Sequence, residues 1–150
     1  MVSAIRFNQF GAPDVLSLET LSEQLPGPGE VWIEQDAIGV NFLDVTQRKG
    51  AVPVALPSGL GLEGAGRVVT VGEGVSNVHV GDRVAYATGP IGSYASARLY
   101  PAERLVKIPD ALSFDDAAAV MFKGITAQYL LKTTYPVAQG TTVLIYGVAG

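Results

Sequence analysis

The sequence predicts a mostly β protein, in which a barrel-like series of short strands precedes the first helix and strand of an α/β unit. Short apolar segments bounded by glycine and proline follow one another over the first two thirds of the chain. A capped helical pattern begins at Ser113. A continuous apolar run at residues 142–146 is typical of a strand in a parallel sheet that is covered on both faces.

The strands can be assigned in order along the chain. Residues 4–7 and 15–18 flank a turn, and residues 31–40 alternate apolar with polar side chains after a turn rich in proline and glycine. Asn41 then caps a short helix that Gly50 closes. Further strands are predicted at residues 65–71, 80–86, 93–99 and 104–108.

A longer helix is predicted over residues 115–132. Ser113 and Asp116 match a capping box in its acidic form, and carboxylates favour the positive end of the helix dipole. Gly124 is a candidate position for a bend. The apolar run at 142–146 ends in the sequence GVAG at 147–150, which resembles the glycine turn that starts a dinucleotide-binding unit but is a weak motif alone.

Composition argues against several functions and partners. The net charge of −4 argues against nucleic acid or an anionic membrane as a partner, and no apolar run approaches the ~20 residues of a membrane span. No basic leader precedes an apolar segment, so a signal peptide is not predicted. The absence of cysteine removes disulfides and thiolate zinc ligands and suits a cytoplasmic protein, and His79 is interpreted as a solvated loop residue.

Six short motifs occur in a fixed order: GAPDVL at 11–16, AIGVNFLD at 37–44, LPSGLGLEGAG at 56–66, VGEGV at 71–75, VGDRV at 80–84 and KGITA at 123–127. Together they resemble the quinone oxidoreductase (zeta-crystallin-like) branch of the zinc-free medium-chain dehydrogenase/reductase superfamily. The resemblance implies an N-terminal fragment. Residues 1–124 form a GroES-like catalytic domain that lacks its C-terminal return segment, and residues 125–150 begin a truncated dinucleotide-binding Rossmann domain.

The resemblance also implies the chemistry. An NADPH-dependent quinone oxidoreductase transfers hydride from the nicotinamide to a quinone or similar electron-poor acceptor without a metal. Zinc-dependent relatives hold their metal with two cysteines and a histidine, and the matching positions here are Asn41, Leu62 and Lys123. These side chains cannot build a tetrahedral zinc site. The expected cofactor is therefore NADPH and not zinc, the expected partner is a small quinone or enone, and the full-length protein is expected to be a homodimer.

Candidate site residues follow from the same resemblance. Asn41 and Asp44 are the candidate catalytic residues, and the candidate cofactor contacts are Asn41, Phe42, Thr46, Thr126, Tyr129 and Gly150. Structural alternatives stay open, because Asn41 also suits an N-cap, Asp44 also suits an ion pair with Arg48, and Thr126 and Tyr129 also suit packing between domains. Many family members carry tyrosine where this chain has Thr46 and Val52, which predicts a wider, less aromatic substrate pocket.

Without a divalent cation, the negative charges of nearby carboxylates need another positive partner. Glu63 matches a carboxylate that lies near the metal in zinc relatives, and Asp44 adds a second negative charge. We hypothesise that Lys123, together with Arg48, supplies the missing positive charge. The alternative is that Lys123 points to solvent.

Two other functions also remain open. The chain could be a non-catalytic GroES-like binding or assembly module, or a zinc-free enoyl reductase of the same superfamily. The segment from Asn41 to Asp44 and the glycine turn favour an enzyme over a plain barrel.

Overall fold

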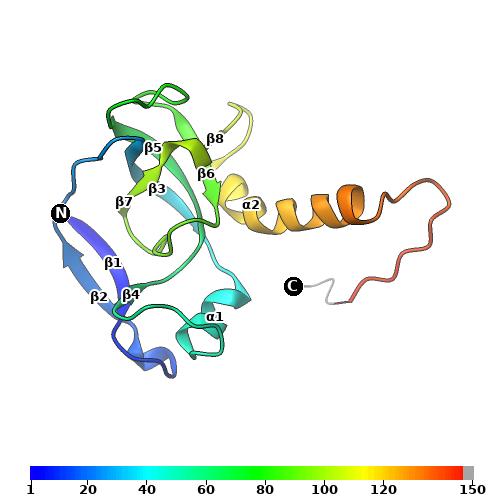
Figure 1. Cartoon of the computed structure of the whole chain (residues 1–150), viewed down its shortest axis with the longest axis horizontal. Helices are drawn as coiled ribbons and strands as arrows, with labels where there is room; N and C mark the ends of the chain where they lie inside the picture. The colour runs from blue at the N-terminus through cyan, green and yellow to red at the C-terminus, as the bar shows by residue number, and fades with distance from the viewer. Residues whose placement is uncertain (147–150) are drawn as a thin grey trace.

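Two antiparallel sheets form the body of the protein (Figure 1). The computed structural model describes residues 1–146. The larger sheet has the strand order β7-β3-β5-β6-β8, with β3 (Glu30–Gly39), β5 (Glu63–Val71), β6 (Arg83–Ala87), β7 (Ala97–Pro101) and β8 (Val106–Lys107). The smaller sheet has the order β2-β1-β4, with β1 (Val2–Phe7), β2 (Ser17–Leu21) and β4 (Ser58–Gly59). The mostly β architecture, with a long helix after the strands, is the one that the sequence predicts.

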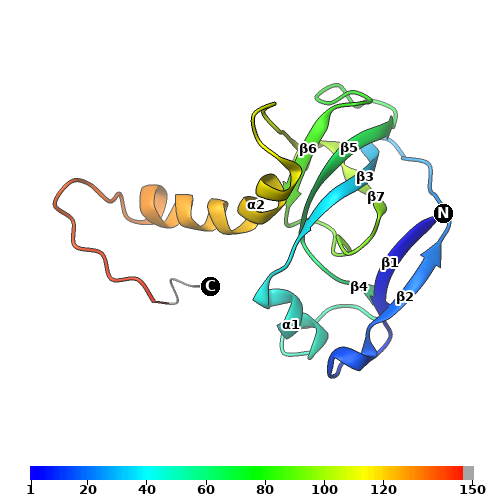
Figure 2. The ribbon, with the colours of Figure 1, turned by 180° about the vertical axis from the view of Figure 1, so that it is seen from behind.

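The helices lie between and beyond the strands. Short 3-10 turns occupy Pro13–Val15 and Ala102–Arg104, and α1 spans Phe42–Arg48 directly after β3. The longer helix α2 (Phe114–Gln128) continues as a π-helical segment over Tyr129–Thr134. It begins against the larger sheet and projects away from it, and the chain then turns back (Figure 2). None of the helices within residues 1–146 is long and apolar enough to cross a membrane.

Three buried clusters fix these elements. The first consists mainly of side chains from the larger sheet. It includes Ile33 and the rings of Tyr86 and Tyr100, whose centroids lie 4.2 Å apart. The second lies around Trp32 and joins the two sheets. The third packs Ala117 and Ala118 of α2 against the larger sheet at Ala65, Ala85 and Ile108. Burial of apolar surface in this third cluster attaches the start of α2 to the barrel.

Several predicted strands are shifted in the structure. Residues 13–15 form a 3-10 turn, so β2 begins only at Ser17. The predicted strand at 93–99 is confirmed only from Ala97, because the carbonyls of Ser93 and Ala95 accept hydrogen bonds from the Gln35 side chain. The predicted strand at 104–108 shrinks to β8 (Val106–Lys107). The local sequence pattern located most of the strands but not their ends, and it missed β4.

The C-terminal part departs further from the prediction. The capping box is confirmed, since the Ser113 hydroxyl accepts a hydrogen bond from the Asp116 amide at 3.0 Å. The helix runs through Gly124 without interruption, and the irregularity falls after Gln128. The predicted strand at 142–146 is wrong: these residues have no regular structure, and Leu144 is 77% exposed. Among the described residues no strand pairs with this segment, and a lone strand leaves its backbone groups without partners.

Gly66 gives a test of this fold. It lies opposite Gln35, beside the register shift between Gln35 and Ala37 in β3, and a Cβ at Gly66 would overlap the backbone of Glu34 and Gln35. We expect Gly66→Ala to lower the free energy of unfolding by about 1–3 kcal/mol in urea titrations, because the two backbones must separate. Gly124→Ala is the matched control and should leave stability equal or up to about 1 kcal/mol higher, since alanine favours a helix. Equal stability of Gly66→Ala and the wild type would contradict the close approach of β3 and β5.

Candidate active site

The candidate site lies where β3 ends, β5 begins and α2 passes above them. The pairing of β3 with β5 sets Gly39 opposite Glu63. Asn41 is the N-cap residue of α1 and follows β3 after a single residue, Val40. Lys123 lies in the second half of α2. Three segments far apart in the sequence therefore meet at the first residue of β5.

The Glu63 carboxylate is the centre of this site. Its side chain is fully buried, and all of its hydrogen-bond partners in the described structure are donors. Oε1 accepts from Asn41 Nδ2 at 2.8 Å and from Lys123 Nζ at 2.6 Å, and Oε2 accepts from the Phe122 backbone amide at 2.7 Å. Two of these donors are neutral and one is charged, which compensates a carboxylate that has left water.

The predicted pairing of Glu63 with Lys123 is therefore confirmed as a contact. The Lys123 side chain is 53% exposed, so its stem reaches out from the surface of α2 while its ammonium group contacts a carboxylate that is fully buried. The alternative, in which Lys123 only points to solvent, does not describe this structure.

Gly39 makes room for the carboxylate. A Cβ added at Gly39 would overlap the Glu63 side chain from its Cγ to its Oε1. Any other residue here would push Glu63 away from Asn41 and Lys123. The sequence analysis did not single out Gly39, because the constraint exists only once β3 and β5 are paired.

Asp44 forms a second buried centre. It is 2% exposed, and its Oδ2 accepts hydrogen bonds from the Asn41 backbone amide and from the Tyr94 hydroxyl, both at 2.9 Å. Burial, followed by the hydrogen bond to Asp44 and the negative charges of Asp44 and Glu63, raises the pKa of Tyr94 above its ordinary value. The sequence analysis missed Tyr94, which lies fifty positions from its partner.

The alternative left open for Asp44, an ion pair with Arg48, does not form in the structure of residues 1–146. Both side chains are buried on α1, and Asp44 Oδ2 is instead taken by the Asn41 amide and the Tyr94 hydroxyl. Arg48 Nε, Asp44 Oδ1 and Gln47 Oε1 are buried without a hydrogen-bond partner. The positive charge that contacts the site therefore comes from Lys123 and not from Arg48.

The remaining predicted residues lie on α1 and at the end of α2. Phe42 is 80% exposed at the start of α1, and the partly buried Thr46 hydroxyl donates to the Leu43 carbonyl. Thr126 is three residues from Lys123 and donates to the Phe122 carbonyl at 2.9 Å. Tyr129 is partly exposed in the π-helical segment. Gly150 lies outside the described residues.

The donor set at this corner does not suit a metal. Leu62 is aliphatic and buried, and Asn41 and Lys123 both donate to one oxygen of Glu63. In residues 1–146 no group of three or more histidine, cysteine or carboxylate side chains is arranged to hold a cation. Zinc needs thiolate, imidazole or carboxylate ligands, and an ammonium group cannot serve.

Comparison with known proteins identifies the family. Residues 27–110, more than half of the chain, match the alcohol dehydrogenase GroES-like domain. Over its whole length the chain is 48% identical to a quinone oxidoreductase of Pseudomonas aeruginosa and 45% identical to a 2-haloacrylate reductase of Burkholderia sp, covering 46% and 47% of those proteins.

Solved structures agree with this assignment. The quinone oxidoreductase of Pseudomonas syringae pv. Tomato DC3000 superposes with a TM-score of 0.90 at 48% identity, over 93% of this chain and 43% of that one. The Escherichia coli quinone oxidoreductase complexed with NADPH gives a TM-score of 0.88 at 42% identity, over 90% and 42% of the two chains. The chain therefore belongs to the alcohol dehydrogenase GroES-like domain family, and quinone oxidoreductases are among the proteins that it is most similar to. It spans about half the length of the curated relatives it matches.

A double-mutant cycle tests the ion pair at the centre of the site. Lys123→Met should lower the free energy of unfolding by about 1–3 kcal/mol, less than for a fully buried pair because Lys123 is half exposed. Lys123→Met combined with Glu63→Gln should recover much of that loss, since no buried charge is then left unpaired. Chemical denaturation of the four proteins gives the coupling energy.

Lys107→Met is the matched control for this cycle. Lys107 is also 53% exposed and pairs with Asp82 at 2.7 Å, but Asp82 itself is partly exposed. Its loss should cost no more than about 1 kcal/mol. Strictly additive effects at Lys123 and Glu63 would mean that the contact contributes nothing to stability.

Tyr94→Phe tests the second centre. Removal of the hydroxyl leaves Asp44 with one donor fewer, which should cost about 1–2 kcal/mol at pH 7. Because the pKa of Tyr94 is raised in the folded state, the neutral phenol stabilises the wild type below the unfolded pKa of about 10, and this contribution is lost as the pH rises further. The difference in unfolding free energy between the wild type and Tyr94→Phe should therefore be largest at pH 7 and should shrink above pH ~10, as denaturation curves at the two pH values will show. Tyr135→Phe, at an exposed position, should match the wild type at both pH values.

Proposed function

We propose that this chain is the catalytic part of an NADPH-dependent oxidoreductase that passes hydride to a quinone or a similarly electron-poor acceptor without using a metal. The observation that carries the proposal is that Asn41 and Lys123 both donate hydrogen bonds to the Glu63 carboxylate. An ammonium group occupies one of the positions that match zinc ligands, so no Lewis acid is available there to polarise an unactivated carbonyl. The acceptor must then be electrophilic already.

The residues around Glu63 and Asp44 suit the nicotinamide end of NADPH by their chemistry. NADPH supplies the hydride when it is bound. Asn41 donates one side-chain N–H to Glu63. Its second N–H and its carbonyl oxygen can then bind the carboxamide of the nicotinamide or the oxygen of the acceptor. Phe42 offers an exposed apolar face beside it, and Thr46 and Thr126 keep acceptor capacity on their hydroxyls. Asp44 holds the backbone of Asn41 in place, which makes it a positioning residue in this proposal.

We also propose a domain boundary near residue 124, with 1–124 as the catalytic domain and 125–150 as the start of a dinucleotide-binding domain that includes Tyr129 and Gly150 among the cofactor contacts. The burial pattern supports this boundary. Ala117 and Ala118 pack into the barrel, whereas Ile125, Leu130 and Leu131 are exposed. On family resemblance alone, we further propose that the whole protein is a cytoplasmic homodimer.

A second class of hydride acceptor, an activated carbon–carbon double bond, should be tested in the same assay of NADPH consumption. The relative named 2-haloacrylate reductase is 45% identical to this chain, which supports hydride transfer to an activated carbon–carbon double bond as the alternative. The membership in an oxidoreductase family does not support a non-catalytic assembly module. The two acceptor classes differ only in where the hydride is delivered.

The proposal predicts the behaviour of the protein extended to the length of its relatives. NADPH consumption should depend on 1,4-benzoquinone or 2-chloroacrylate and should be unaffected by metal chelators. Asn41→Ala should lower kcat/KM by about a hundredfold, as expected when a donor to the reacting groups is lost. Asn8→Ala, in an exposed loop, should retain the wild-type rate.

Two results would contradict the proposal. One is zinc bound at about one ion per chain and removed together with activity. The other is an Asn41→Ala protein that is folded and fully active, because Asn41 would then be only a helix cap.

A further inference from the structure

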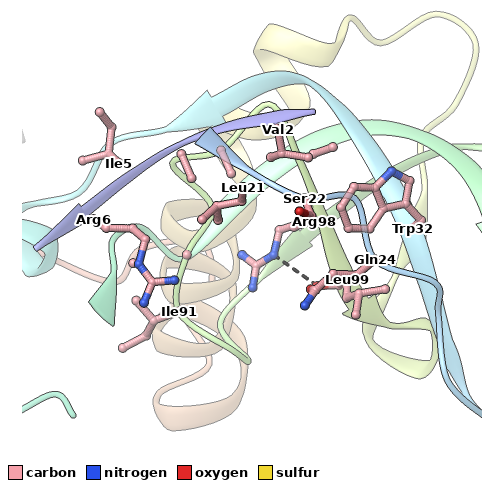
Figure 3. A pocket seen from close by; sticks show the side chains of 15 residues that line it. Val2, Ile5, Arg6, Leu21, Ser22, Gln24, Trp32, Ile91, Arg98 and Leu99 are labelled. Carbon is pink, nitrogen blue, oxygen red and sulfur yellow. Dashed lines mark hydrogen bonds between the residues drawn. The ribbon is translucent and has the colours of Figure 1, made fainter. Parts of the chain in front are cut away.

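A pocket lies away from the candidate active site, between the β1–β2 hairpin and the β3–β7 edge of the larger sheet (Figure 3). Its volume is about 400 Å³. One part of its wall is apolar and includes Leu21, Trp32 and Leu99, whereas Arg6 and Arg98 bring two guanidinium groups to the same space. It contains none of the residues proposed above for hydride transfer, so the inference that follows is independent of that proposal.

Arg98 is the unusual feature of this pocket. It is only 9% exposed, yet no carboxylate within residues 1–146 lies within ion-pair distance of it. Nη2 donates to the Pro90 carbonyl at 2.6 Å, Nε to the Leu99 carbonyl at 3.3 Å, and Nη1 to the Tyr86 hydroxyl at 3.5 Å. All three acceptors are neutral. A guanidinium has five N–H groups, so two remain for another partner.

The groups around Arg98 stabilise its positive charge but provide no negative charge to pair with it. The guanidinium carbon lies 5.3 Å and 5.2 Å from the ring centroids of Tyr86 and Tyr100, where the aromatic faces attract a cation. Burial raises the pKa of Tyr86 to about 12, so its phenol stays neutral and provides no negative charge. A buried charge without an opposite charge is costly, and an anion that enters the pocket would reduce that cost.

Arg6 places a second positive charge beside this wall. Its side chain is partly exposed and makes a loose ion pair, with Nε 3.6 Å from Glu19 Oε2. Glu19 is also partly exposed, so its attraction for Arg6 is weakened by solvent. Ser22 and Gln24 add polar side chains at the end of β2.

We propose that this pocket binds a small organic anion with an oxyanion head and a compact apolar body. A carboxylate matches the planar donor geometry of a guanidinium, and here Arg98 and Arg6 offer two such groups. The apolar body lies against Trp32, Leu21 and Leu99. A volume of about 400 Å³ is near the lower end of ligand pockets, which selects a single-ring or short-chain acid rather than a cofactor.

Trp32 makes the proposal directly testable. It is the only tryptophan of the chain and lines the pocket, so its fluorescence reports ligand in this place. Titration of the 150-residue chain with cyclohexanecarboxylate should give a saturable change in Trp32 emission. The neutral cyclohexanecarboxamide should bind at least about tenfold more weakly, because it cannot form charge-assisted hydrogen bonds. Inorganic phosphate should compete with the carboxylate, since both heads use the guanidinium groups.

Substitutions separate the two arginines from the apolar wall. Arg98→Met should weaken carboxylate binding by at least about tenfold, and Arg6→Gln by about twofold to fivefold. Arg67→Gln is the control: this arginine is exposed on β5 and stacks on Phe114 outside the pocket. Should Arg98→Met fail to fold, the partly exposed Arg6 and the comparison of acid with amide still decide the matter.

Three outcomes would overturn the proposal. The first is the lack of any saturable change in Trp32 emission with the carboxylate. The second is equal affinity for the acid and its amide, which would make the pocket apolar in function. The third is unchanged carboxylate affinity in every folded arginine variant of the pocket.

Discussion

The buried carboxylate of Glu63 is the contact on which the arrangement of this protein around its candidate site depends. It begins β5, accepts from the side chain that follows β3, and accepts both a backbone amide and an ammonium group from α2. A carboxylate that has left water needs such donors, because an unpaired buried charge is unfavourable. The requirement of one side chain thus fixes the relative positions of three segments, and Gly39 has to lack a Cβ for this to happen.

The same contact limits the chemistry. Asn41 and Lys123 satisfy Glu63, and Leu62 packs as a buried aliphatic group, so the carboxylate has its donors from the protein itself. Under the proposed function, catalysis then depends on placing a nicotinamide and an activated acceptor beside Asn41. The pocket at Arg98 has the opposite character, with a cation whose charge its neighbours leave unpaired. The buried negative charge of Glu63 is therefore paired, whereas the buried positive charge of Arg98 is not.

Local sequence rules explain much of the fold but stop where contacts are long-range. The caps at Asn41 and Ser113 were predictable, because capping depends on neighbouring residues. The Lys123–Glu63 contact was predictable from charge, because a family resemblance placed both residues around one vacated position. Tyr94 and Gly39 were not, since each matters only after distant strands have paired. The segment at 142–146 shows the reverse error: its strand pattern is clear, but a strand also needs a neighbour to pair with.

Hydrogen exchange of backbone amides in Glu63→Gln tests most directly whether this carboxylate holds the elements together. A glutamine keeps the shape of Glu63 but replaces one acceptor oxygen with a donor, so it loses at least one of the three hydrogen bonds and the negative charge that pairs with Lys123. The account predicts that protection falls by about tenfold or more in α2 and at the start of α1, whereas amides in the β3–β5 core, such as those of Ile33 and Val68, keep theirs. Equal loss of protection in the core and in α2, or no loss at all, would contradict it.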